Sequence, residues 1–179
     1  MPMIDALIPE GALKPEAETR LLKELTDILI AAEGFDPDTN QVAQNATWLF
    51  LHRPAAIFVA GAKSATPRYR IIPTVPEGQY TDEARKVLVR KVTEAIARAE
   101  GGKFDEVASR VWVFPTEIPD GAWGGRGRIA RLPEIQAALA GEHERKIGEE
   151  RLARRRRDKA REIFAGALDA VHRGTAGDA

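Results

Sequence analysis

No cysteine occurs among the 179 residues of the chain. This absence excludes disulfides, thiol nucleophiles and metal sites built on thiolates. No apolar run approaches the roughly 20 residues that a transmembrane helix needs. No charged and apolar leader precedes the first apolar stretch, so the expectation is a cytoplasmic protein that does not use a membrane.

An excess of charge of one sign is also missing, because 27 Lys and Arg balance 27 Asp and Glu. The chain as a whole has no field that would attract nucleic acid, and we do not expect a nucleic-acid partner. The histidines His52, His143 and His172 do not have the spacing of metal ligands, so we expect neither a metal nor a cofactor. Aromatic residues make up only 6% of the chain, but its aliphatic residues suffice for a core.

Three short motifs of the first half of the chain recur in the second half in the same order. They are a Pro-Glu-Gly turn, an Ala-Glu-Gly helix end and a Trp-apolar-Phe strand, at 9–11 and 76–78, 32–34 and 99–101, and 48–50 and 112–114. Between turn and helix end, apolar residues recur at helical spacing in both halves. We therefore predict two copies of one β-α-β unit, at about 2–66 and 67–132.

Two such units predict the fold class. A strand, a crossover helix and a second strand form a right-handed parallel pair. Two copies give an α/β (α+β) fold with a four-stranded mixed sheet and two helices on one face. We expect residues 1–141 to form this domain and residues 142–179 to form a charged helical C-terminal tail.

The predicted strands are apolar on both faces. Their apolar residues do not alternate cleanly with polar ones, as seen at Ile4, Leu7, Ile8, Ile71, Ile72, Val111, Val113 and Phe114. Strands of this kind are covered on both sides, and two helices on one face cover only one of them. We infer that another subunit covers the second face.

The residue after the initiator methionine, Pro2, is a chemical candidate. A small residue there normally lets an aminopeptidase remove Met1, which leaves a free secondary amine at the head of a strand. A free α-amino group has a pKa of roughly 7.7–8, so it suits a general acid or base near neutral pH. The plain alternative is that Met-Pro is a common start without a functional role.

A duplicated β-α-β unit that begins with Pro2 resembles the tautomerase superfamily, whose archetype is 4-oxalocrotonate tautomerase. The resemblance covers about residues 2–132. It implies a fused pair of units, assembly as a homotrimer, and Pro2 as the catalytic acid or base for a small-molecule carboxylate substrate. Ala12 and Gln79 stand where the archetype has an Arg after the Glu-Gly turn, so that carboxylate site is missing.

The site residues are most similar to those of malonate semialdehyde decarboxylase. That branch uses the terminal Pro, an Asp just after the first helix, and two arginines at alternate positions that open the second repeat. Pro2, Asp38, Arg68 and Arg70 match these places. The resemblance therefore implies a catalytic role for all four residues.

Three further residues are candidates for substrate binding or water activation. Trp123 and Arg126 belong to the glycine-rich run 123–128, which also resembles the decarboxylase branch. The stretch 112–117 is similar to the cis-3-chloroacrylic acid dehalogenase branch, which makes Glu117 a candidate water-activating carboxylate.

Strand geometry supports the arginine pair independently. Arg68 and Arg70 flank Tyr69, the repeat counterpart of Pro2. Residues i and i+2 of a strand point to one face, so the two guanidiniums share a direction and suit a small oxo acid and its enolate. The alternatives are that these arginines solvate a strand edge and that Asp38 belongs to an Asx turn.

The charged segment 142–173 has helical propensity and contains the arginine run 154–157. Such a run usually forms a solvated helix face, and a patch for nucleic acid or an acidic partner is the sharper alternative. The apolar stripe further along is amphipathic, and we expect it to dock on the core or on a neighbour; it consists of Ile163, Phe164, Ala167, Leu168 and Val171.

Three functional hypotheses follow. In the leading one, Pro2 is the acid/base for keto-enol tautomerisation of a small oxo acid. In the second, protonated Pro2 polarises the oxo group of a 3-oxo acid while it loses CO2, as in malonate semialdehyde decarboxylase. In the third, the chain is a non-enzymatic trimeric scaffold with an Arg-rich tail that binds a partner.

Overall fold

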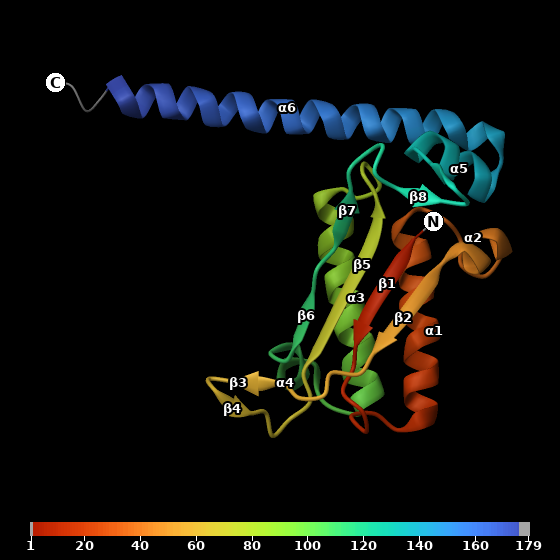
Figure 1. Ribbon diagram of the computed structural model, residues 1–179, viewed down its shortest axis with the longest axis vertical. Helices are drawn as coiled ribbons and strands as arrows, with labels where there is room; N and C mark the ends of the chain where they lie inside the picture. The colour runs from red at the N-terminus through yellow and green to blue at the C-terminus, as the bar shows by residue number, and fades with distance from the viewer. Residues whose placement is uncertain (1, 176–179) are drawn as a thin grey trace.

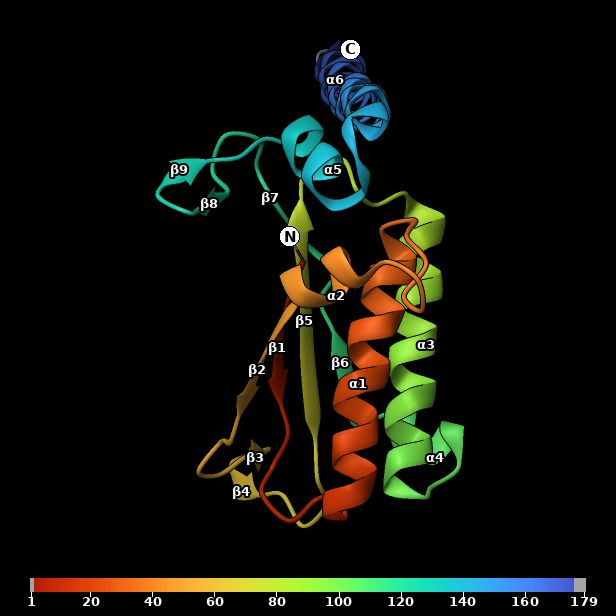
Figure 2. The same cartoon turned by 90° about the vertical axis from the view of Figure 1, so that its right-hand side faces the viewer.

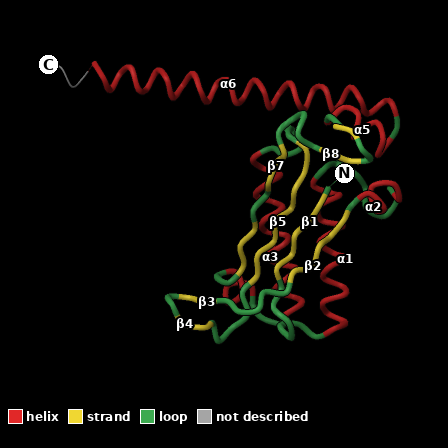
Figure 3. The backbone as a smooth tube through the Cα atoms, in the orientation of Figure 1, coloured by secondary structure: helices red, strands yellow, loops and turns green. Residues whose placement is uncertain are grey.

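The computed structural model describes residues 2–175, except for the side chains of Val171, His172, Gly174 and Thr175. The expectations for Met1 and for the Val171 and His172 side chains therefore lie outside the described residues. Figure 3 shows a central sheet backed by helices, with one long helix crossing the upper end.

The helix of the first repeat, α1 (Pro15–Ala32), forms because its apolar residues fall on one stripe. Leu21, Leu25 and Leu29 are spaced at about one turn, and all three are buried against the sheet. Gly34 follows the helix with a φ of 91°, the left-handed conformation that ends a helix without a Cβ penalty.

The helix of the second repeat, α3 (Asp82–Glu100), follows the same plan. The Thr81 hydroxyl accepts a hydrogen bond from the Ala84 N–H at 3.1 Å, which caps the amino end. Gly101 ends the helix in the left-handed conformation. The predicted helix end at 99–101 is therefore present.

The central sheet joins the two repeats. In spatial order its strands are β2 (Trp48–His52), β1 (Met3–Leu7), β5 (Tyr69–Pro76) and β6 (Val111–Val113), and β7 (Thr116–Ile118) also pairs with β5. Strand β1 is parallel to β2, and β5 is parallel to β6 and β7, whereas β1 and β5 are antiparallel. The predicted mixed sheet of two β-α-β units is confirmed, with the last strand divided into β6 and β7.

Among residues 2–175, helices cover only one face of the sheet. Figure 2 shows α1 and α3 side by side on that face. Trp48 and Phe50 lie on β2, Trp112 lies on β6, and Phe114 directly follows β6. All four are exposed, and the exposed fractions of Trp48 and Trp112 are 62% and 66%. A single chain therefore leaves a large apolar surface open, as the sequence predicts.

Short elements complete the repeats and connect them to the C-terminal helices. They are α2 (Gln41–Ala46), the hairpin β3 (Phe58–Val59) and β4 (Ala62–Lys63), α4 (Phe104–Ala108), and the hairpin β8 (Gly124–Gly125) and β9 (Arg128–Ile129). Figure 1 places the β3–β4 hairpin and the C-terminal helices at opposite ends of the sheet.

A cap made of the C-terminal helices covers the upper end of the sheet. We define the C-terminal cap as residues 132–159, which comprise α5 (Leu132–Ala140), the 3-10 turn Glu142–Glu144 and the first half of α6 (Arg145–Thr175). Its buried apolar residues are Leu132, Ile135, Leu139 and Leu152. The cap is thus packed on the repeats and is not a separate tail.

The arginine run in α6 binds the turns beneath it. Arg154 donates to the Gly78 carbonyl at 3.3 Å, and the Arg155 side chain lies 3.4 Å from the Glu117 carboxylate. The interpretation of this run as a solvated helix face is therefore wrong for both residues. Charge complementarity between α6 and the ends of β5 and β7 explains the difference.

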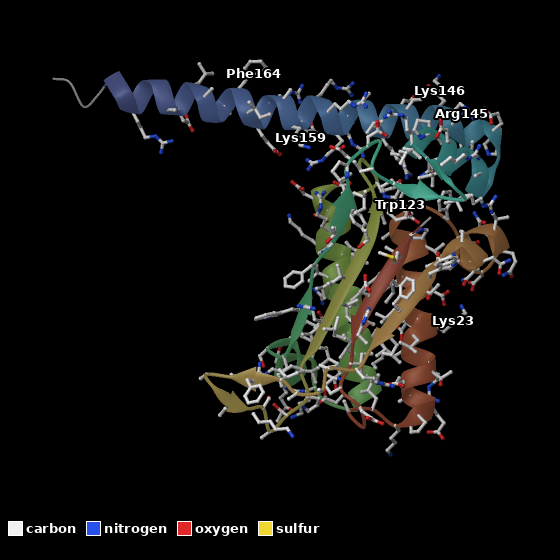
Figure 4. The ribbon with its side chains drawn as sticks, viewed as in Figure 1. Lys23, Trp123, Arg145, Lys146, Lys159 and Phe164 are labelled. Atoms are coloured by element: carbon white, nitrogen blue, oxygen red, sulfur yellow. The ribbon has the colours of Figure 1, made fainter. Side chains whose placement is uncertain are left out.

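The second half of α6 extends past the edge of the sheet (Figure 1). Figure 4 shows Phe164 on this overhang, and Ile163, Phe164 and Leu168 are at least 60% exposed. The apolar stripe therefore does not dock on the core of its own chain. Within residues 2–175, every helix is too short or too polar to cross a lipid bilayer.

Candidate active site

Pro2 is buried at the head of β1. Its carbonyl accepts a hydrogen bond from the Trp48 N–H at 3.3 Å, and the next residue, Met3, pairs with Thr74 of β5. Pro2 and Ile4 are buried, whereas Met3 is partly exposed, so Pro2 continues the side of β1 that faces the helices. The start of the chain is therefore fixed by the sheet.

A buried carboxyl group, Glu33, lies at the same end of the sheet. It follows Leu25 and Leu29 at intervals of four residues, so it continues the stripe of α1 that packs on the sheet. A crossover helix returns along its strand in the opposite direction, which brings the last turn of α1 to the start of β1. Glu33 is 0% exposed, an unusual position for a carboxylate.

Hydrogen bonds connect Glu33 to the C-terminal cap through Gln79. Glu33 Oε1 accepts from Gln79 Nε2 at 2.9 Å, and Gln79 Oε1 accepts from Gln136 Nε2 at 2.9 Å and from Arg151 Nη1 at 2.7 Å. Arg151 Nη1 also donates to the Glu33 carbonyl at 2.7 Å. The end of α1, the turn after β5 and both cap helices therefore meet in one polar cluster, which we call the Glu33 cluster.

The environment of the Glu33 cluster perturbs its titratable groups. Burial raises the pKa of Glu33 to about 7, while the positive amino terminus of the chain, the Gln79 amide and Arg151 act against this rise. Burial also raises the pKa of Tyr80, and the Glu33 charge adds to that effect. Among the described residues, Glu33 Oε2, Tyr80 Oη and Gln136 Oε1 are buried without a hydrogen-bond partner.

Arg68 and Arg70 lie at the opposite end of the sheet from Pro2. The antiparallel register pairs Arg70 with Leu7, whereas Met3 pairs with Thr74. At about 3.3 Å per residue, the five residues from Pro2 to Leu7 place roughly 17 Å of strand between Arg70 and the level of Pro2. In one chain the two arginines therefore do not join Pro2, because antiparallel pairing of the repeats sends equivalent residues to opposite ends.

Asp38 occupies an exposed turn. Its backbone N–H donates to Asp36 Oδ1 at 2.9 Å, and the Thr39 hydroxyl donates to Asp36 Oδ2 at 2.8 Å. This is an Asx turn after α1. The structure thus gives Asp36 and Asp38 a local turn geometry, and the side chain of Asp38 is exposed.

Glu117 holds the turn that carries Gln79. Its Oε1 accepts from the N–H groups of Gly78 and Tyr80 at 2.9 and 3.2 Å, and its Oε2 accepts from Arg85 Nη2 at 2.8 Å. Both oxygens are therefore engaged with the protein, which is a positioning role at the same end of the sheet as Pro2.

Trp123 and Arg126 belong to the β8–β9 hairpin. Arg126 and Gly127 have φ values of 52° and 74°, as in the two-residue turns that join antiparallel strands. Arg126 is exposed at the tip, and Trp123 is half-buried at the base. Figure 4 shows Trp123 at the level of the sheet end that α6 crosses.

Two hollows in the surface involve other residues. One of about 360 Å³ lies around Arg53, Lys63 and Ser64, and one of about 340 Å³ lies between the cap helices beside Asp120. Neither is lined by Pro2 or Glu33. The chemical character of the Pro2 end therefore comes from its buried polar groups and its strand geometry.

Several solved structures of other proteins share this fold. No protein-family model and no curated protein match the chain. The solved structure of Pt0534 inactivated by 2-oxo-3-pentynoate is 22% identical with a TM-score of 0.57, and the match covers 72% of this chain and 94% of that chain. A fused 4-oxalocrotonate tautomerase, described as a symmetric trimer, is 22% identical with a TM-score of 0.56 over 72% of this chain and 94% of that chain. A member of the cis-3-chloroacrylic acid dehalogenase family is 16% identical with a TM-score of 0.57 over 83% of this chain and 97% of that chain.

The chain has the fold of the tautomerase superfamily. This fold is shared by enzymes, with tautomerases and dehalogenases among the neighbours. The resemblance in the sequence and the architecture of the structure therefore agree.

Proposed function

We propose that the chain is an enzyme whose Pro2 nitrogen, free after removal of Met1, transfers protons at a carbon next to the carbonyl of a small oxo acid. The observation that carries this proposal is the burial of Pro2 at the head of β1 in a tautomerase fold, at the end occupied by the Glu33 cluster. A strand fixed by hydrogen bonds positions a terminal amine as firmly as a side chain, which general acid-base catalysis requires.

In the leading reaction, neutral Pro2 accepts the proton from the carbon next to the carbonyl. The electron pair of the broken C–H bond forms a C=C bond, and the π pair of the carbonyl moves onto its oxygen, which gives an enolate. Return of a proton to the enolate completes keto-enol tautomerisation. Arg151 is the cation that we assign to the substrate carboxylate, because within one chain it reaches the Glu33 cluster and Arg68 and Arg70 do not.

A second reaction is favoured by the carboxyl group of Glu33 at the same end of the sheet. A carboxylate close to an amine stabilises its protonated form. Protonated Pro2 would polarise the oxo group of a 3-oxo acid while the C–C bond to the carboxylate breaks, and CO2 leaves. The pH dependence of kcat separates the two reactions, since a base must be deprotonated and an acid must be protonated.

We further propose that three chains assemble with their open sheet faces inward. The exposed Trp48 and Trp112 provide the apolar surface, and fused 4-oxalocrotonate tautomerases of this fold form trimers. Burial of such a surface stabilises association at about 25 cal/mol per Å² of apolar area.

The test uses protein whose loss of Met1 is confirmed by mass. It is incubated with phenylpyruvate, 2-hydroxymuconate and malonate semialdehyde, and wild type is compared with Pro2→Ala. Turnover that requires Pro2 supports the enzyme. Equal turnover in both proteins, or none on any oxo acid, would leave the scaffold hypothesis.

A further inference from the structure

The second repeat contains two residues, Tyr69 and Glu100, that are equivalent to Pro2 and Glu33 of the first repeat. Tyr69 and Glu100 each lie 67 residues after Pro2 and Glu33. In the second repeat, the Tyr69 hydroxyl at the head of β5 donates to Glu100 Oε2 at the end of α3, at 2.8 Å. The glutamate at the helix end therefore faces the first residue of the strand in this unit.

The two glutamates differ in how their charge is balanced. Arg110 Nη1 lies 3.0 Å from Glu100 Oε2, so the arginine balances the charge of Glu100 and the Tyr69 phenol adds a hydrogen bond. The residue of the first repeat that is equivalent to Arg110 is Ala46. Met3 pairs with Trp48 as its equivalent Arg70 pairs with Trp112, and Ala46 and Arg110 each lie two residues before the tryptophan. An alanine provides no charge, so no arginine reaches Glu33 from this position, and the cations that act on Glu33 are the amino terminus and Arg151 of α6.

The remaining neighbours of Glu33 leave one oxygen free. Gln79 binds Oε1, and Arg151 of α6 contacts Gln79 and the Glu33 carbonyl. Tyr80 faces Glu33 from the turn after β5, with Arg85 of α3 and Glu117 of β7 beyond it. Oε2 is buried without a partner among the described residues. A buried acceptor of this kind costs about 1–3 kcal/mol unless a donor reaches it.

We propose that the Glu33 carboxylate is the positioning partner of the Pro2 nitrogen, and that the C-terminal cap holds it in place through Gln79. Removal of Met1 converts the Pro2 nitrogen from an amide without hydrogen into a secondary ammonium with two N–H donors. One N–H donates to Glu33 Oε2, either directly or through one water. A water can bridge them because the proline nitrogen does not extend as far toward the glutamate as the tyrosine hydroxyl does. The carboxylate thereby fixes the direction of the amine and stabilises its protonated form.

This inference deepens the proposed function, but its first test needs no substrate. The protein is labelled with 15N-proline, loss of Met1 is confirmed by mass, and the pKa of the terminal amine is measured by NMR titration. In Glu33→Gln we expect that pKa to fall by about one unit or more, because the opposite charge is lost. Glu24→Gln, in the same helix but paired with Arg98 of α3, is the matched control and should leave the pKa unchanged. An equal amine pKa in wild type and Glu33→Gln would overturn the proposal.

A second variant keeps the test decisive if Glu33→Gln does not fold. Glu33→Asp retains the charge but moves it away from the amine by one methylene. We therefore expect the amine pKa to fall less than in Glu33→Gln. An amine pKa equal to that of wild type would overturn the proposal. On a substrate whose turnover requires Pro2, the pH midpoint of kcat should shift in the same direction. Loss of the Pro2 requirement would defeat the proposed function and leave the NMR result valid.

Discussion

At the scale of single residues, the chemistry that we propose involves Pro2 and Glu33. Pro2 becomes a titratable group only when Met1 is gone, and Glu33 is titratable near neutral pH because it is buried. Each residue alone has a plain explanation, as a common second residue and as the end of a helix. Their position at the same end of the sheet makes them candidates for an interacting amine and carboxylate.

Retention of Met1 should abolish activity without disturbing the fold. An amide nitrogen has no basic lone pair, so Pro2 cannot transfer a proton in that form. We expect the Met-retaining protein to have the same circular dichroism and melting temperature as the processed protein, with turnover reduced at least a hundredfold. Equal turnover of the two forms, separated and verified by mass, would eliminate Pro2 as the acid/base.

The pKa of Glu33 also makes stability depend on pH. Its folded value is about 7, against an ordinary value of 4.5, so the folded chain retains a proton that the unfolded chain releases between these values. The stabilisation is complete below pH 4.5 and is lost as pH rises through 7, and its size is on the order of 3 kcal/mol.

Glu33→Gln should remove this dependence in the protein that retains Met1. Denaturant unfolding at fixed concentration should show wild type losing stability relative to the variant between pH 5 and 8, by up to about 3 kcal/mol. The processed protein should lose less, because the Pro2 ammonium stabilises the carboxylate. A difference between wild type and variant that is constant with pH would contradict the assignment.

At the scale of elements, local patterns could be predicted and long-range docking could not. The stripe of Leu21, Leu25 and Leu29 predicts α1, and the repeated turn and helix end predict the duplicated unit. The matching Ala-Glu-Gly motifs also contained the signal for Glu33, because Glu33 lies one turn beyond Leu29. Its burial was missed, since a charged residue at a helix end is ordinarily solvated.

The catalytic role of Arg68 and Arg70 stays a prediction, because the sheet separates them from Pro2 within one chain. Their place in the repeat says nothing of whether two units pair parallel or antiparallel. Sequence also gave no signal for Gln136 and Arg151, because their contacts with Gln79 span more than 50 residues and depend on how the cap docks. Local periodicity does not encode such contacts.

Truncation should distinguish the C-terminal cap from the overhang of α6. A chain that ends at Gly141 loses Arg151 and the buried Leu152, so its melting temperature should fall by roughly 5 °C or more. A chain that ends at Ala160 keeps the whole cap and should melt close to wild type. Equal melting temperatures for all three proteins would show that α6 adds nothing to the stability of the repeats.

At the scale of the whole molecule, the open sheet face is the surface through which we propose that three chains assemble. We expect Trp112→Glu to convert the trimer into folded monomers, because the side chain is 66% exposed in one chain and the charge would be buried between chains. Phe164→Glu, on the overhang, is the control and should leave assembly intact. Light scattering that shows a monomeric wild type, or a trimeric Trp112→Glu, would contradict this arrangement.

The duplication has a consequence that follows from a polypeptide having a single amino terminus. Copying a β-α-β unit copies every side chain, but a chain has only one amino terminus, so a terminal amine cannot be inherited by the second copy. The strand head of that copy carries Tyr69, joined to Glu100 and Arg110 in a brace of hydrogen bonds. Of the two equivalent positions, only the first can therefore carry the terminal amine that we propose as the acid/base, and the second stabilises the fold.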